Sequence, residues 1–553
     1  MPARDGRFKC PRFMELPNSN PQPALKTRSL NKHIAQSAGI IMAAMLVSRV
    51  LGFLRDWTVA HQLGSSAITD AYYAAFTLPD MLSYLVAGGT LGMFFIPVFA
   101  DYVARNREDQ AWHVYSTILT FMTVVFAALI LIGEIFAPQL VRLIAPGFGP
   151  QERSLVVFLT RLILPAQLFL CLGSVMSSVQ NAKMRFFVPA LGSAIYNLGV
   201  VLGGWLLFAR FGIAGFAIGL VVGAFFGYFV LQVFAVRRVG ARFTPNLNLR
   251  HPGFVLFLKL GVPIMLALSV DITDDWIIRW FGSYLAPASI TWLMYAKTLM
   301  RAPLVVVGAA MGAASYPFLA RLYSEGKFQE LNRTLNATLK GVILILIPIS
   351  AMAIVLCKPV VYFVFSHTRL HGHDFDATAM ALAIFSAGLF ARGLQMLVSR
   401  GLYASHDTIT PAVAGTSLTF LGLPVYWYCS RHWNYMGLAG ASSFLAIVLA
   451  LVLFGILLRR TGNQGFRSLF VCFTKVTIAS VGAALVCMRL LIWLESRLVW
   501  HNTRGAFEIL VVVSAVGFSL ILLFARMLGV NEIENYWKKL IAWKPKNAIV
   551  ASD

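Results

Sequence analysis

The sequence between Ile34 and Leu63, IAQSAGIIMAAMLVSRVLGFLRDWTVAHQL, is the first of many apolar stretches in the chain. It is long enough to cross a bilayer, because a helix of about 20 mainly apolar residues spans the hydrocarbon core. Its second half carries Arg49, Arg55 and Asp56. An arginine at the centre of a membrane helix costs roughly 2.5–3.5 kcal/mol, so two of them indicate a water-filled cavity that attracts anions rather than a lipid-facing surface.

The composition predicts a polytopic membrane protein. Of the 553 residues, 58% are hydrophobic and only 12% are charged, and the mean hydropathy is +0.73. Soluble domains are far more polar. Fourteen apolar stretches of membrane-spanning length begin near residues 34, 70, 111, 153, 187, 213, 253, 288, 337, 377, 409, 435, 468 and 505. We therefore expect an all-α fold with fourteen transmembrane helices.

A weak internal repeat predicts two lobes. The segment Leu63–Pro79 resembles Phe281–Leu299, and the Gly-rich spans that follow end in Phe95–Ala100 and Ser315–Ala320. Transporters are often built from two such halves around a central site, and the offset here is about 220 residues. The predicted organisation is a basic disordered cytoplasmic tail at 1–33, a first lobe of six helices at 34–240, a second lobe of six helices at 251–462, two further helices at 463–530 and a cytoplasmic tail at 531–553.

The net charge of +23 is explained by membrane topology without a nucleic-acid partner. Lys and Arg are concentrated in both terminal tails and in alternate loops, and the opposite loops hold about half as many. This bias predicts a multi-pass membrane protein with both termini in the cytoplasm.

The sequence contains no convincing catalytic or metal-binding constellation. The six cysteines lack the paired spacing of a zinc or redox site. Asp374 and Asp376 form an Asp-x-Asp motif in a His-rich loop, which would suit a polyprenyl-linked sugar transferase, but so short a motif is more often a solvated loop. We expect neither an enzyme nor a metal or cofactor.

Several short motifs follow one another along residues 35–530. They are Ser48–Asp56, Thr69–Tyr72, Ala145–Phe148, Asn181–Ala190 with Asn197, Trp292 with Tyr295 and Ala296, and Tyr403 through Asp407 to Pro411. In this order they resemble the MviN/MurJ lipid II flippases of the multidrug/oligosaccharidyl-lipid/polysaccharide exporter superfamily. The resemblance implies transport of undecaprenyl-linked peptidoglycan precursor from the cytoplasmic to the periplasmic leaflet, which would place the protein in the bacterial inner membrane and make it part of cell-wall biogenesis.

The pyrophosphate of such a cargo calls for cationic ligands, and guanidinium groups suit phosphate by their planar, multi-donor geometry. Arg49 and Arg55 are the main candidates, although six residues place them about 120° apart around a regular helix. The alternative is that they form structural pairs between helices. The other predicted substrate-binding residues are Asp56 and Asp70, which matches an acidic position of the family, and Lys297 and Arg301, which share one helix face.

Three carboxylates in the seventh predicted span, Asp271, Asp274 and Asp275, form a candidate ion-coupling site. Buried carboxylates are costly unless they are hydrated, protonated, paired or bound to a cation. One hypothesis is therefore a site for Na⁺ or H⁺, and the other is ion pairing of Asp275 with Arg279 and with Lys297 or Arg301.

The predicted function is a lipid II flippase that works by alternating access, as a monomer in contact with membrane lipids. The chain departs from the family on its second helix, where Ser83, Tyr84 and Gly88 replace charged positions, and on its eighth, at Lys297 and Arg301. These departures leave open export of another lipid-linked oligosaccharide, such as O-antigen or exopolysaccharide units. A drug exporter or a membrane glycosyltransferase is a weaker alternative, because arginines in the first lobe do not suit cationic drugs.

Overall fold

The computed structural model describes residues 46–87, 91–266, 270–404, 407, 409–462, 465–497 and 501–530, and all regular secondary structure in these ranges is helical. Both predicted terminal tails and residues 34–45 of the first span lie outside the described residues.

The first lobe consists of six helical rods, several of which are interrupted by a bend or a π-helical turn. They are residues 46–63; α2 (Ala67–Ala75), α3 (Thr77–Ala87) and α4 (Leu91–Ala104); α5 (Glu108–Ile144); α6 (Pro150–Ile163) and α7 (Ala166–Ala182); α8 (Phe187–Leu202), η1 (Gly203–Leu207) and α9 (Phe208–Phe211); and α10 (Ala214–Ala224), η2 (Phe225–Val230) and α11 (Leu231–Arg238).

Six more rods form the second lobe, and two follow it. The second lobe contains α12 (Pro252–Leu266) and α13 (Val270–Gly282); α14 (Ser289–Ser324); α15 (Phe328–Val355) and α16 (Cys357–Phe365); α17 (His373–Ala387) and α18 (Leu389–Ala404); and α19 (Ile409–Thr461), which is two rods because Trp433 and Asn434 are not helical. The last two rods are α20 (Phe466–Glu495) and α21 (Thr503–Met527).

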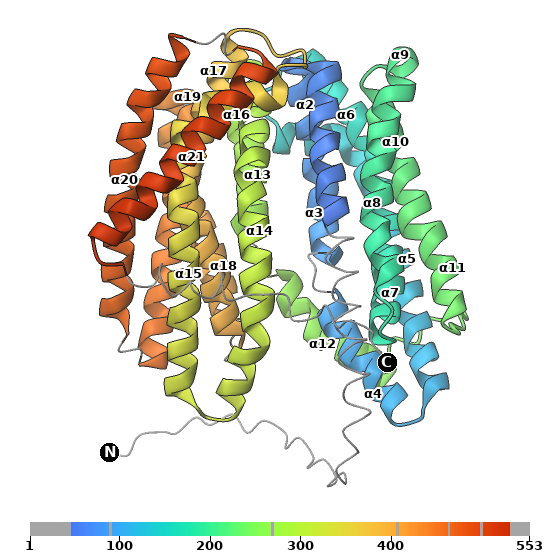
Figure 1. Cartoon of the computed structure of the whole chain (residues 1–553). Coiled ribbons are helices and arrows are strands. Elements are labelled where there is room, and N and C mark those ends of the chain that lie inside the picture. Colours follow the sequence, from blue (N-terminus) through green and yellow to red (C-terminus); the bar gives the residue numbers. More distant parts are fainter. Residues whose placement is uncertain are drawn as a thin grey trace, which may run out of the picture.

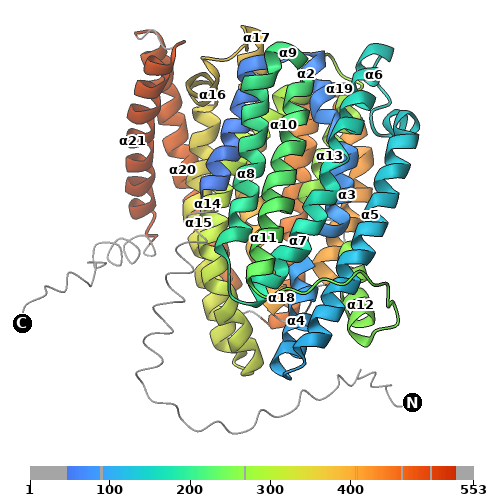
Figure 2. The same cartoon turned by 90° about the vertical axis from the view of Figure 1, so that its right-hand side faces the viewer.

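The described residues thus confirm the all-α membrane fold with two groups of six rods and two additional rods. Eight of the described helices are individually long and apolar enough to cross a membrane, and the pair α17 and α18, bent by 42°, makes a ninth candidate. The two lobes stand side by side in Figure 1, and α20 and α21 lie at the outer edge of the second lobe in Figure 2. This pair packs on α15 and α16.

The seventh rod is shared between the two lobes. Its first half, α12, packs against α3, α4 and α5, and Phe254 and Phe257 enter the apolar core of the first lobe. Its second half, α13, packs against α14 and α19 of the second lobe. A movement of one lobe against the other must therefore be absorbed between these two halves.

The first lobe contains a close glycine seam between α8 with η1 and α10. Gly199 and Gly203 face Gly215, Gly219 and Gly223 across it. A methyl group added at Gly199 would lie 2.6 Å from the Gly219 carbonyl oxygen and 2.6 Å from the Gly223 Cα atom. Small residues of this kind let membrane helices approach closely, since packing rather than the hydrophobic effect holds them together in lipid.

We expect Gly199→Ala to destabilise the first lobe by about 1–3 kcal/mol, because the seam has no room for the added carbon. Gly455→Ala in α19 is the matched control, since no heavy atom lies within 4 Å of the position of its new carbon. The control should be neutral or stabilising by up to about 1 kcal/mol through helix propensity. Thermal unfolding of both purified variants tests this, and equal midpoints would contradict it.

Candidate functional site

The two lobes meet through their upper ends in Figure 1, where the loops 64–66, 283–288 and 366–372 lie. The upper half of the first rod supplies part of this seal. The Trp57 indole N–H donates to the Val364 carbonyl oxygen at 3.0 Å, and the Arg369 amide donates to the Ala60 carbonyl oxygen at 3.2 Å. The Tyr295 hydroxyl also donates to the Gly64 carbonyl oxygen at 2.9 Å. These contacts close the upper end of the molecule.

Asp70 joins the equivalent helices of the two lobes at this seal. It lies in the first turn of α2 and is buried. One carboxylate oxygen accepts from the Thr291 amide at 2.7 Å and from the Thr291 hydroxyl at 2.6 Å, so that it caps the first turn of α14. Ala288, which precedes α14, provides no side-chain cap. A carboxylate at a helix N-terminus is favoured by the unpaired amides and by the helix dipole.

Arg55 and Asp56 lie below the seal on the first rod. The Arg55 Nε atom donates to Asp56 at 2.9 Å, and the other Asp56 oxygen accepts from the Thr298 hydroxyl of α14 at 2.9 Å. The Arg55 side chain is 31% exposed. Arg49 lies about 9 Å further from the upper end along the same rod and is exposed.

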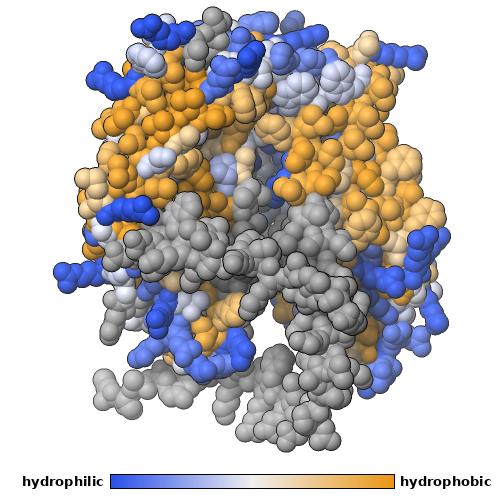
Figure 3. Space-filling model, viewed as in Figure 1, coloured by the Kyte–Doolittle hydropathy of each residue, from blue (hydrophilic) through white to orange (hydrophobic). Residues whose placement is uncertain are grey.

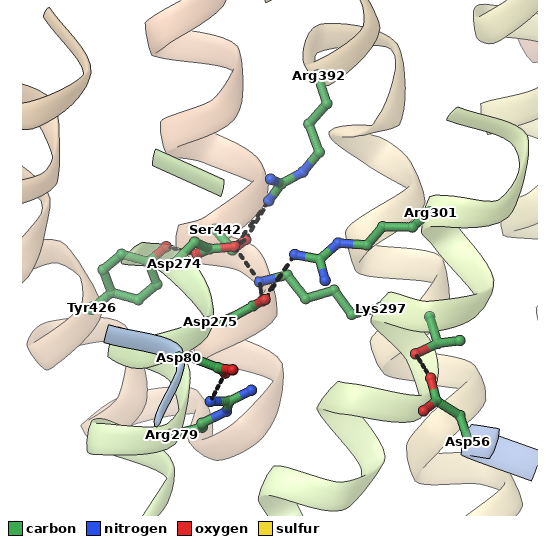
Figure 4. A network of polar contacts seen from close by, with 11 residues as sticks. Asp56, Asp80, Asp274, Asp275, Arg279, Lys297, Arg301, Arg392, Tyr426 and Ser442 are labelled. Carbon is green, nitrogen blue, oxygen red and sulfur yellow. Dashed lines mark hydrogen bonds and ion pairs between the residues drawn. The ribbon is translucent and has the colours of Figure 1, made fainter. Parts of the chain in front are cut away.

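The carboxylates of α13 lie in a buried polar network, which Figure 4 shows. Asp274 is 3% exposed. Its Oδ2 atom accepts from Lys297 Nζ at 2.5 Å, from the Ser442 hydroxyl at 2.8 Å and from Arg392 at 3.2 Å. The Tyr426 hydroxyl donates to Oδ1. Three helices, α14, α18 and α19, thus direct donors at one carboxylate of α13.

Asp275 shares the same lysine. Its Oδ1 atom accepts from Lys297 Nζ at 2.5 Å, and Arg301 donates to both Asp275 oxygens at 3.0 Å. The Arg301 side chain is 40% exposed, so it forms the accessible edge of the network. Asp271 lies in α13, but its side chain falls outside the described part of the structure. The described contacts of Asp274 and Asp275 are ion pairs and hydrogen bonds within the chain.

Arg279 has a different partner from the expected Asp275. It donates to Asp80 of α3 at 2.8 Å and thereby makes an ion pair between the two lobes. The Tyr84 and Trp276 rings meet at the same helix contact, with centroids 6.0 Å apart. The sequence analysis missed Asp80, although it is an acidic residue within a predicted span.

The Asp-x-Asp motif of the competing enzyme hypothesis makes structural contacts. Asp374 accepts from the Trp292 indole N–H at 3.0 Å and from the His371 amide at 3.1 Å. Asp376 pairs with Lys358 at 2.8 Å. Within the described ranges, no group of three or more His, Cys, Asp or Glu residues is placed to hold a metal.

Below the sealed end, the face shown in Figure 3 is hollowed between the two lobes, with hydrophilic atoms inside the hollow. Because α14 runs away from the upper end, Arg301 lies one turn further from that end than Thr298, which bonds Asp56. Arg49, Arg55 and Arg301 therefore lie at or beyond the level where the first rod meets α14. Cationic groups from both lobes thus lie beyond this contact, on the side that faces away from the sealed end.

Comparison with known proteins identifies the family. The model of the lipid II flippase MurJ family matches residues 59–526, a range that contains all the predicted site residues except Arg49, Arg55 and Asp56. The lipid II flippase MurJ of Burkholderia cenocepacia is 27% identical over 475 residues, which cover 83% of this chain and 90% of the relative. The probable lipid II flippase MurJ of Thermotoga maritima is 25% identical over 522 residues, which cover 92% and 99%.

Solved structures show the same fold. An inward closed structure of lipid II flippase MurJ is 20% identical with a TM-score of 0.73, and the match covers 91% of this chain and 99% of that one. An inward-facing multidrug resistance transporter of the MATE family is 15% identical with a TM-score of 0.63, covering 77% and 98%. With a family match that extends over most of both lobes, the chain belongs to the lipid II flippase MurJ family.

Proposed function

We propose that this protein carries lipid II from the cytoplasmic to the periplasmic leaflet by alternating access. The observation that carries this proposal is the family match over residues 59–526, which includes both lobes apart from residues 46–58 of the first described rod. The two-lobed fold, sealed at one end and hollowed between the lobes, supports the same mechanism, in which the lobes rock about a central site.

The family and the many apolar helices make this a multi-pass protein of the bacterial inner membrane. Its orientation follows from charge. Arg and Lys residues gather at the lower end of the molecule in Figure 1, near the loops 105–107, 183–186, 239–251 and 325–327. By the bias of these residues toward cytoplasmic loops, the lower end and both termini are cytoplasmic. The described state is then closed toward the periplasm, and a single chain supplies both lobes of the transporter.

The exposed cations at the hollow would bind the pyrophosphate of the cargo. Arg55, Arg279, Lys297, Arg301 and Arg392 supply five positive charges. The described carboxylates that pair with them are Asp56, Asp80, Asp274 and Asp275. Arg49 adds a further positive charge. We assign Arg49, Arg55 and Arg301 to substrate binding because their side chains are at least partly exposed, and Asp56, Asp70 and Lys297 to holding the helices around them.

Complementation tests the function. We expect the wild-type protein to restore growth and outer-leaflet lipid II in cells depleted of their own lipid II flippase. Arg49→Ala and Arg55→Ala should fail, because each charged hydrogen bond lost to a phosphate costs about 1.5–3 kcal/mol, or roughly 10-fold to 150-fold in binding. Outer-leaflet lipid II is measured by its cleavage with an enzyme added outside the cells.

Arg210→Ala is the matched control, since this exposed arginine of α9 lies at the opposite end of its rod from the cytoplasmic loops and away from the hollow. It should support growth as the wild type does. Failure of a correctly inserted wild-type protein to rescue would reject lipid II as its cargo. Full rescue by both arginine variants would reject the proposed binding residues alone.

A further inference from the structure

The ammonium group of Lys297 occupies a position that resembles a binding site for a dehydrated cation. It is 1% exposed and lies 2.5 Å from an oxygen of Asp274 and 2.5 Å from an oxygen of Asp275. Hard cations such as Ca²⁺ bind carboxylate oxygens at about 2.3–2.6 Å. The face of the Phe385 ring lies 5.8 Å from the same nitrogen, within the range of a cation–π contact. The side chain is thus enclosed by two carboxylates and an aromatic ring.

The other hydrogen-bond donors to Asp274 are also side chains of the protein itself. Arg392 of α18 and both Ser442 and Tyr426 of α19 donate to its two oxygens. The described cations that pair with Asp274 and Asp275 are Lys297, Arg301 and Arg392, while Arg279 of the same helix pairs with Asp80. The positive groups are covalently part of the chain, which means that the described network needs no external cation for neutrality.

We propose that Lys297 is a tethered counter-cation, which fills the place that a free monovalent cation would take between α13 and α14. The packing of the second lobe, and with it the flipping cycle, is therefore independent of Na⁺. The statement about flipping rests on the proposed function, whereas the statement about packing does not.

The proposal makes a definite prediction for a variant without the ammonium group. Lys297→Met removes the charge and keeps an unbranched chain, so that one oxygen of Asp274 and one of Asp275 lose their ammonium partner. A cation that binds only the folded state raises its stability with concentration. Na⁺ should therefore stabilise this variant and not the wild type.

The experiment is thermal unfolding of the full-length protein in detergent, with NaCl exchanged for choline chloride at constant ionic strength. We expect no dependence of the wild-type midpoint on Na⁺ and a saturable rise of several degrees for Lys297→Met. Lys297→Arg keeps the charge and should behave as the wild type does. Lys475→Met is the control for the loss of a lysine elsewhere. Lys475 is far along the chain from this network and donates to the Gly529 carbonyl oxygen at 3.2 Å.

The double variant Asp274→Asn, Lys297→Met should lose the Na⁺ response of Lys297→Met, because one of the two carboxylates that would bind Na⁺ is gone. Saturable stabilisation of the wild type by Na⁺ would overturn the proposal, and so would a Lys297→Met protein that gains nothing from Na⁺ or stays unfolded at every concentration. Complementation is measured separately, so the unfolding result can be interpreted even if the protein does not flip lipid II.

Discussion

Asp274→Ala is expected to have the largest effect on stability of any single substitution in the second lobe. The carboxylate accepts from Lys297, Arg392, Ser442 and Tyr426, and the side chains of the two cations are almost entirely buried. Removing one member of a buried ion pair costs about 3–5 kcal/mol, because the remaining charge is left without compensation. This is a large part of the 5–15 kcal/mol that typically stabilises a folded protein.

Chemical unfolding of the purified variant in detergent measures this loss, and the yield of correctly inserted protein in membranes reports it in cells. Asp101→Ala is the matched control, since that carboxylate is exposed on α4 and pairs only with Arg105 one turn away. Surface pairs of this kind are worth about 0–1 kcal/mol. Equal stability of the two variants would show that the buried network contributes little.

Asp70→Ala is expected to open the periplasmic end. The substitution removes both hydrogen bonds to Thr291 and leaves the start of α14 without its cap. A loss of about 2–4 kcal/mol, which two hydrogen bonds to a charged acceptor justify, would shift the ratio of closed to open molecules by about 30-fold or more. Flipping should slow, since a transporter that rests open outward seldom collects cargo from the cytoplasmic side.

Spin labels at Ile68 and Tyr284 can measure the opening, because both side chains are exposed and lie on opposite lobes at the sealed end. Cys10 of the N-terminal segment is replaced first, as are Cys357 and Cys429, which are only partly buried. The distance distribution should lengthen in Asp70→Ala and stay unchanged in Asp101→Ala. An unchanged distribution in both would mean that the Tyr295, Trp57 and Ala60 contacts close this end without Asp70.

The hydropathy of the chain was enough to predict the number and order of the rods, because each span must contain a long apolar run. It predicted their ends less well. The ninth span was expected near residue 337, whereas α15 begins at Phe328, since its first two turns are polar and extend beyond the apolar part. The sharing of the seventh rod between the lobes was not predicted, because hydropathy locates a span but does not show which helices its two halves pack against.

Most charged residues of the site were found from the sequence, although Asp80 was missed, and pairing of Asp275 with Lys297 or Arg301 was one of two hypotheses. A charged residue within a membrane span is expected to have a partner. Arg279 and Asp80 are 199 residues apart, and Asp70 and Thr291 are 221 apart, so only the assembled fold brings them together. For Asp274 and Asp275 the sequence left an ion site and ion pairing equally open. Their contact with Lys297 depends on the relative rotation of α13 and α14, which spacing along one helix does not reveal.

The ion pairs of Asp275 also bear on how the chain enters the membrane during synthesis. An isolated α13 would bring three carboxylates and Arg279 into lipid, and each such charge costs about 2.5–3.5 kcal/mol on insertion. The neutralising groups follow soon afterwards, since Lys297 is only 22 residues beyond Asp275 and Arg301 only 26. We therefore expect α13 and α14 to leave the translocon together as a hairpin. Lys297 and Arg301 of α14 would then neutralise the carboxylates of α13 before either helix contacts the acyl chains.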